Sequence, residues 1–160
     1  MANLKEIPKY KNTILSLIIS NENIVDLLNG NIEQSEDLIG VNLFDYPKIP
    51  LAEEELAYIT VEIDIPTMFN IKNKIFRKPQ IVLDIIVHDK LMKTNTIGNR
   101  LDLLCSEIDR VFNGFSGLGF KNWEFDSLKS IYYTNRHYGK RITFSAVEKS
   151  IESCVSTWVY

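Results

Sequence analysis

The sequence predicts a single α+β domain with a mainly antiparallel four-stranded sheet and helices packed on one face. The chain has 160 residues, of which 45% are hydrophobic and 24% charged, as is ordinary for one globular domain. Hydrophobic residues recur at helical spacing in two stretches and at strand spacing in four others. The order is helix, strand, strand, helix, strand, strand, and such grouping of strands is typical of α+β domains. We expect this domain to cover residues 1–149, followed by a C-terminal tail at 150–160.

The first periodic stretch runs from Lys11 to Leu28 and predicts a helix. Polar residues at 20–23 indicate a break, with a new N-cap for a second short helix that ends before Gly30. Residues 31–55 show no clear period, and their prolines and aspartate predict an extended segment rich in turns. The acidic run Glu53, Glu54 and Glu55 within this segment is expected to face solvent.

Two strands follow. Apolar and polar residues alternate over 58–65, which predicts a half-buried strand that Pro66 ends. Residues 79–88 are apolar at both parities, so this strand is expected to be central and covered on both sides. The connection over 67–78 is expected to be a loop, with basic side chains at Lys72, Lys74, Arg77 and Lys78.

A second helix is predicted over 96–113, capped by Asn95 or Thr96 and ended by Gly114. Its apolar stripe is expected to bury Ile97, Leu101, Leu104, Cys105, Ile108, Val111 and Phe112. Strands at 130–136 and 141–149 close the fold, joined by a hairpin turn at residues 137–139. The tail ends in Trp158, Val159 and Tyr160, and such an apolar end is expected to dock on its own domain or on a neighbour.

Composition excludes several classes of function. The formal net charge of −3 predicts no strong field that would attract nucleic acid or an acidic membrane. The two cysteines, Cys105 and Cys154, form no metal motif and are too few for a disulfide scaffold, which favours a reducing compartment. The first twelve residues have no apolar signal core, so no signal segment is expected, and no apolar run approaches the ~18 residues of a membrane span. No cofactor is expected.

One group of acidic and histidine residues is compatible with an enzyme. Asp64 and Asp84 lie on successive predicted strands, and His88 shares the face of Asp84, so a metal-dependent nuclease is an alternative. However, Asp89 and Lys90 are adjacent and would point to opposite faces of a strand, which is the wrong spacing for that chemistry. The favoured interpretation is that Asp84 pairs with a buried donor and that His88 lies at the rim of the sheet.

The glycine-rich stretch 114–120 has the composition of a phosphate-binding loop but the wrong position. A true phosphate loop leads into a helix N-terminus, whereas this stretch leaves a helix C-terminus, where the helix dipole is negative. It also lacks the GK[ST] ending. A flexible or interface loop with aromatic residues from Phe115 to Trp123 is therefore expected.

The layout resembles the small neck and tail-completion proteins of tailed bacteriophages, especially the tail-terminator type. The segments that carry this resemblance are 24–28 at the end of the first helical stretch, the proline-containing 46–50, the strand 78–85, the helix 98–114 and the closing strand 138–144. The resemblance implies a closed homo-oligomeric ring, commonly a hexamer, in the virion neck or tail. It also implies synthesis in the host cytoplasm, contacts with neck and tail-tube proteins, and a channel that meets DNA transiently.

Ring closure requires heterologous contacts, in which one face of a subunit meets a different face of the next. Three candidate interface surfaces are the acidic patch, the basic loop and the aromatic loop, and the C-terminal tail is a further one. Contact between the acidic patch of one subunit and the basic loop of the next would set the register of the ring. The alternative is that both groups of charges only confer solubility. The candidate interface residues are Glu53, Glu54, Glu55, Lys72, Lys74, Arg77, Lys78, Phe115, Phe120, Trp123, Trp158 and Tyr160. Alternatives to a terminator are a head-completion adaptor or baseplate component, the metal-dependent nuclease, and a small cytosolic binding module.

Overall fold

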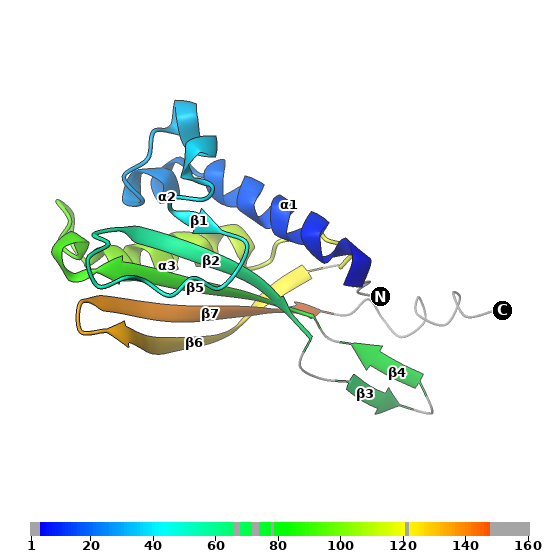
Figure 1. Ribbon diagram of the computed structural model, residues 1–160. Helices are drawn as coiled ribbons and strands as arrows, with labels where there is room; N and C mark the ends of the chain where they lie inside the picture. The colour runs from blue at the N-terminus through cyan, green and yellow to red at the C-terminus, as the bar shows by residue number, and fades with distance from the viewer. Residues whose placement is uncertain (1–3, 66–67, 72–73, 78, 121, 148–160) are drawn as a thin grey trace.

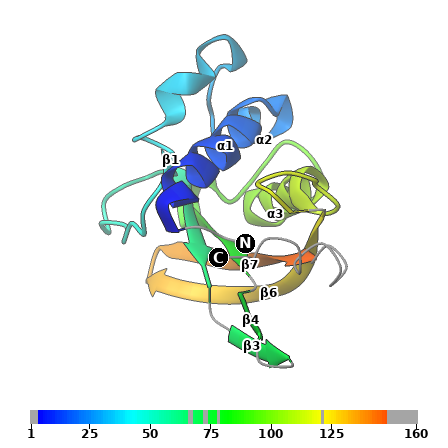
Figure 2. The same cartoon turned by 90° about the vertical axis from the view of Figure 1, so that its right-hand side faces the viewer.

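The computed structural model describes residues 4–65, 68–71, 74–77, 79–120 and 122–147. One five-stranded sheet has the strand order β1-β2-β5-β7-β6, and helices α1, α2 and α3 lie on one of its faces (Figures 1 and 2). The fold is therefore α+β, as the sequence predicts. None of the helices in the described ranges is long and apolar enough to cross a membrane.

The sheet is mixed and has one strand more than expected. Its strands are β1 Leu43–Phe44, β2 Ala57–Asp64, β5 Gln80–His88, β6 Asn122–Thr134 and β7 His137–Val147. β1 pairs with β2 in parallel, and all other neighbours are antiparallel. The expectation of four strands is wrong because β1 has two residues, which is too short to show a period. It comes from the segment 31–55, which also contains a 3₁₀ helix, η2, at Ile32–Leu38.

The predicted strands at 58–65 and 79–88 correspond to β2 and β5, which pair with Ile59 opposite Ile85. β5 is central, and it is buried on both sides. The loop expected over 67–78 instead contains a separate hairpin, β3 Met68–Ile71 and β4 Lys74–Arg77. This hairpin projects beyond the end of the main sheet (Figure 1).

The helices at the N-terminus break where the sequence predicts. A short 3₁₀ helix, η1, covers Leu4–Glu6, α1 covers Ile7–Ile19 and α2 covers Glu22–Leu27. The side chain of Asn21 accepts a hydrogen bond from the backbone N of Ile24 at 3.0 Å, so Asn21 is the new N-cap.

The third helix begins later than predicted. α3 covers Arg100–Phe112, and Asn99 caps it by accepting a hydrogen bond from the backbone N of Asp102 at 2.8 Å. Gly98 has φ +109°, which is outside the helical range, so α3 cannot extend back through this residue. Ile97 is 98% exposed and does not belong to the buried stripe. A second 3₁₀ turn, η3 at Asp89–Leu91, precedes this region.

The C-terminal hairpin also differs from the prediction. Residues 137–139 belong to β7, and the turn lies at residues 135–136, between Thr134 and His137. Gly139 suggested a turn, but it lies inside β7, and glycine is required there for a different reason. A Cβ there would lie 3.1 Å from the Tyr133 ring and 3.2 Å from the Ile85 carbonyl oxygen. β6 in turn begins at Asn122, eight residues before the predicted start.

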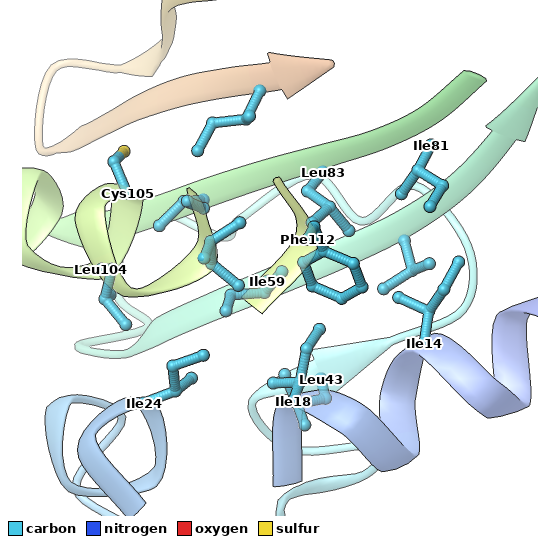
Figure 3. Packing of buried hydrophobic residues seen from close by; sticks show 14 of the residues in the cluster. Ile14, Ile18, Ile24, Leu43, Ile59, Ile81, Leu83, Leu104, Cys105 and Phe112 are labelled. Carbon is cyan, nitrogen blue, oxygen red and sulfur yellow. The ribbon is translucent and has the colours of Figure 1, made fainter. Parts of the chain in front are cut away.

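The core lies between the sheet and the helices. Ile14 and Ile18 of α1 and Leu104 and Phe112 of α3 pack on side chains of β2 and β5 such as Ile59 (Figure 3). Burial raises the pKa of the Cys105 thiol on α3 to about 12, so this cysteine behaves as a small apolar residue.

Candidate interaction surfaces

The outer face of the sheet, opposite the helices, carries an ion pair whose carboxylate is buried. Arg141 of β7 donates from Nε and Nη2 to the two carboxylate oxygens of Asp84 on β5, both at 2.7 Å, and Tyr133 Oη donates to Oδ2 at 2.8 Å. Asp84 lies opposite Arg141 in the strand register, so one antiparallel pairing places the two side chains together. Burial first, and then the hydrogen bond to Asp84, raise the pKa of Tyr133 above its usual value. Asp84 is therefore buried and paired within the chain, as expected, but its donors are not buried, since the Arg141 side chain is 46% exposed and Tyr133 is half-buried.

His88 is buried and does not lie at the rim, so that part of the prediction is wrong. Its ring stacks edge-on against His137, with centroids 4.9 Å apart, and both side chains have no exposed surface. The cause is the β5–β7 register, which places the two residues opposite each other under the segment that carries Glu54. His137 Nε2 donates to the Glu54 carbonyl oxygen at 2.8 Å, whereas His88 Nε2 has no hydrogen-bond partner in the described part of the chain.

Asp64, Asp84 and His88 cannot share one metal ion. Thr60 lies opposite Asp84, and Asp64 is four residues further along β2. At ~3.3 Å per residue the two carboxylates are separated by about 13 Å, and His88 lies about as far in the other direction. In the described ranges, no group of three or more His, Cys, Asp or Glu side chains is arranged to hold a metal. The nuclease interpretation therefore has no site at these residues.

The aromatic loop folds back on the core. The backbone N of Gly114 donates to the Trp123 carbonyl oxygen at 2.7 Å, and Gly114 has φ +83°, as expected at a helix end. Phe115 and Phe120 are partly buried against the core. Trp123 is 1% exposed in β6, and its indole N donates to the Gly117 carbonyl oxygen at 3.2 Å. Its side chain therefore belongs to the core of this chain.

The acidic patch is partly neutralised within the chain. Glu54 pairs with Lys48 at 3.1 Å, and the hydrogen bond from Lys48 holds the pKa of the Glu54 carboxyl below its usual value. Glu55 pairs with Lys90, and Glu53 is exposed without a salt bridge in the described part of the structure. Lys48 also lies over the rings of Phe44 and Tyr58, 4.7 and 5.3 Å from their centroids. These contacts fasten the extended segment to the sheet.

The remaining predicted interface residues divide into two groups. Lys74 and Arg77 lie on β4 of the projecting hairpin. Lys72, Lys78, Trp158 and Tyr160 lie outside the described residues.

Exposed large hydrophobic side chains in the described structure belong, with the exception of Ile97, to two parts of the chain. The segments before and after β1, here called the β1-edge surface, carry Ile32, Ile39, Val41, Tyr46, Ile49 and Leu51. The β6-edge surface is formed by the C-terminal hairpin, and its members are Phe125, Leu128, Tyr132 and Tyr138. β1 and β6 are the two edge strands, so these surfaces lie at opposite edges of the sheet (Figure 1). Sequence reasoning missed both surfaces.

A groove of about 420 Å³ adjoins the β6-edge surface, between α3 and the β6–β7 hairpin. Phe125, Leu128 and Ile142 form its apolar floor, and Asp109 of α3 lies on its wall. Oδ1 of Asp109 is buried without a hydrogen-bond partner in the described structure.

Comparison with known proteins gives one family and one fold. A family model described as YomW matches residues 12–146. No curated protein matches the chain. Among solved structures, the chain is similar to a chain in the virion of a native gene transfer agent particle, with 12% identity and a TM-score of 0.55. That similarity covers 85% of this chain and 91% of the other, so the two share a fold over nearly their whole lengths.

Proposed function

This chain belongs to the YomW family, and from that premise we propose that it is a virion structural protein that forms a ring at the end of a phage tail tube. The observation that carries the proposal is the fold shared with a virion chain over 85% of this chain. The layout that resembles tail terminators points to the same role. As a terminator, the protein caps the tube, joins tail to head and contacts neighbouring neck and tail-tube proteins in the virion.

The two exposed apolar surfaces support self-assembly. Soluble monomers rarely leave large contiguous apolar surface exposed, and such surface is typical of an interaction site. Here the surfaces differ from each other and lie at opposite edges of the sheet. That arrangement suits a heterologous contact, which closes into a ring when the rotation between neighbours is right.

The projecting hairpin is the part of the fold that we assign to the channel. The sequence places four basic residues in 72–78, at and around β4. Basic side chains on a projection into a channel would meet DNA phosphates without reading the sequence. This assignment replaces a pairing of the basic loop with the acidic patch, because two of the three glutamates already pair within the chain.

Loss of the gene from the virus tests the terminator role. A terminator stops tube growth, so its absence is expected to give tails of uncontrolled length that do not join heads, seen by electron microscopy of lysates. Tails of normal length beside heads that lose their DNA would instead indicate a head-completion adaptor. Normal infectious particles would contradict both roles.

A further inference from the structure

The layer of helices does not extend over β6. In the strand register, Phe125 lies opposite Phe144 and Leu128 opposite Ile142, so the four side chains share the face of the sheet on which the helices lie (Figure 2). Phe144 and Ile142 are buried, whereas Phe125 and Leu128 are 46% and 45% exposed. The groove beside α3 opens over these two side chains. In the described structure, the helical layer is therefore one element short at this edge.

The segment that follows β7 lies outside the described residues, and its sequence has the pattern of a short amphipathic helix. Its apolar residues recur at the spacing i, i+3, i+4, i+7 and i+8, and they are Ile151, Cys154, Val155, Trp158 and Val159. The residues between them, 152, 153, 156 and 157, are all polar. Nine residues of helix measure about 14 Å. So short a helix is marginal in water by itself, and its apolar side needs a surface to pack on.

We propose that residues 151–159 form this helix and dock in the groove of the same chain, beside α3 and over Phe125 and Leu128. The occupant of the groove is thus the chain's own segment after β7, here called the tail helix. This docking does not require the proposed ring. Tyr132 and Tyr138 do not line the groove, so they stay available for contacts between copies.

The end of β7 lies within reach of the groove. β7 ends at Val147, opposite Asn122, and Phe125 is three residues further along β6, which is about 10 Å. Residues 148–150 span up to about 10 Å when extended, so they are long enough to connect the two. The backbone N of Phe125 donates to Asn113 Oδ1 at 3.3 Å, which places the C-terminal end of α3 at the same end of the groove. The tail helix would therefore run antiparallel to α3, an arrangement that the two helix dipoles favour.

The lining of the groove suits a helix with one apolar side. Phe125, Leu128 and Ile142 form an apolar floor for the stripe that contains Trp158. The α3 side of the groove consists of small or polar side chains from one side of that helix, namely Asp102, Cys105, Ser106, Asp109 and Asn113. A helix that packs its stripe on the floor keeps its polar side toward solvent, as the sequence of the segment requires.

The short connection favours the chain's own tail helix over that of a neighbouring copy. A segment joined to its site by a short flexible linker is present there at a roughly millimolar effective concentration. Only three residues, 148–150, separate β7 from the tail helix. A neighbouring copy competes with this only where the protein itself is as concentrated.

The two cysteines of the chain provide a direct readout. Cys154 lies on the apolar stripe, so docking is expected to protect its thiol from a water-soluble thiol reagent. Burial raises the pKa of the Cys105 thiol to about 12, so Cys105 reacts slowly. We expect wild-type Cys154 to be labelled about tenfold more slowly than Cys154 in the double variant Ile151→Ser with Trp158→Ser, which breaks the stripe. Cys154→Ser measures the background from Cys105.

A change in the groove itself is expected to have the same effect. Leu128→Ser removes part of the floor and should raise the labelling rate of Cys154, whereas Ile97→Ser, at a 98% exposed site outside the groove, should leave it unchanged. Melting temperatures show whether each variant folds. If Leu128→Ser does not, the double variant of the tail helix decides, because its changes lie outside the described core. Wild-type labelling as fast as that of the double variant would overturn the docking.

Cross-linking shows which chain supplies the tail helix. Ser106→Cys places a thiol on the α3 side of the groove, and a short bismaleimide is expected to join it to Cys154. The expected product has the mass of one chain on a denaturing gel at every protein concentration. Ile97→Cys is the matched control and is expected to give no such product. A product with the mass of two chains, or no product from Ser106→Cys, would overturn docking within one chain.

Discussion

At the scale of single residues, the Asp84–Arg141 pair shows what a sequence does and does not tell. The apolar residues around Asp84 predict that it is buried in β5, and burial of a carboxylate demands a partner. The partner itself is 57 residues away, and only the β5–β7 register identifies it. The same register explains why His88 is buried against His137, which the sequence alone did not reveal.

We expect Arg141→Gln to lower the free energy of unfolding by about 2 kcal/mol, since it leaves the Asp84 carboxylate buried with Tyr133 as its remaining donor. Urea unfolding at neutral pH measures this change. The matched control is Lys129→Gln on β6, directly opposite Arg141 and without a salt bridge in the described structure. An equal effect of the two substitutions would contradict a special role for the Asp84–Arg141 pair.

A second ion pair joins α3 to β7 and gives a prediction for pH dependence. The hydrogen bond from Lys140 holds the pKa of Asp102 below its ordinary value of 3.8, and the same bond raises the pKa of Lys140 above 10.5. The depressed carboxyl pKa stabilises the fold above pH 3.8, and this stabilisation is lost as pH falls through the folded-state pKa. The raised lysine pKa contributes stability that is fully present below pH 10.5 and is lost as pH rises through the folded-state pKa.

Asp102→Asn is therefore expected to cost at most about 1 kcal/mol between pH 5 and 9, because both side chains are partly exposed. The difference from wild type is expected to shrink once the pH is below 3.8. Thermal melts across this range check the prediction. A difference that stays constant into acid would show that the ion pair is not its source.

At the scale of elements, long periodic stretches were predictable and their ends were not. The stripe from Leu101 to Phe112 identified α3, alternation identified β2, and a short run that is apolar at both parities identified β5. The α3 start was misplaced because both Asn95 and Asn99 are suitable caps and a single sequence does not rank them. Gly139 misled the turn prediction because glycine serves both turns and close approaches, and here it makes room for the Tyr133 ring.

The N-cap of α3 can be tested directly. Asn99→Ala is expected to lower the free energy of unfolding by about 1 kcal/mol, since it removes the acceptor for the Asp102 backbone N. Asn95→Ala, at the cap position first predicted, is expected to stay within about 0.5 kcal/mol of wild type. Chemical denaturation of both variants compares the two. Reversed magnitudes would place the helix start where the sequence suggested.

At the scale of the whole molecule, the order of elements was sufficient for the fold class and for a resemblance to tail terminators. It was not sufficient for the surfaces. Whether Phe125 or Leu128 is exposed depends on which strands the helices cover, and that follows from the strand order rather than from any local pattern. β1 was missed for the same reason, because two residues become a strand only when β2 pairs with them.

The charge distribution has a similar origin. The seven carboxylates of 31–55 are visible in the sequence, but their position around β1 at one edge of the sheet appears only in the fold. The ion pairs of Arg136, Lys140 and Arg141 with acids from β5, α3 and the turn after β5 are likewise set by the fold and not by any local pattern.

The central claim is that this chain assembles with copies of itself into a closed ring. Sedimentation velocity across a concentration series, with negative-stain images of the same samples, measures this most directly. We expect one discrete species with the mass of a small ring, commonly a hexamer of the 18.5 kDa chain, and round particles with a central hole. A two-fold dimer as the end point, or a monomer through the highest concentration, would contradict it.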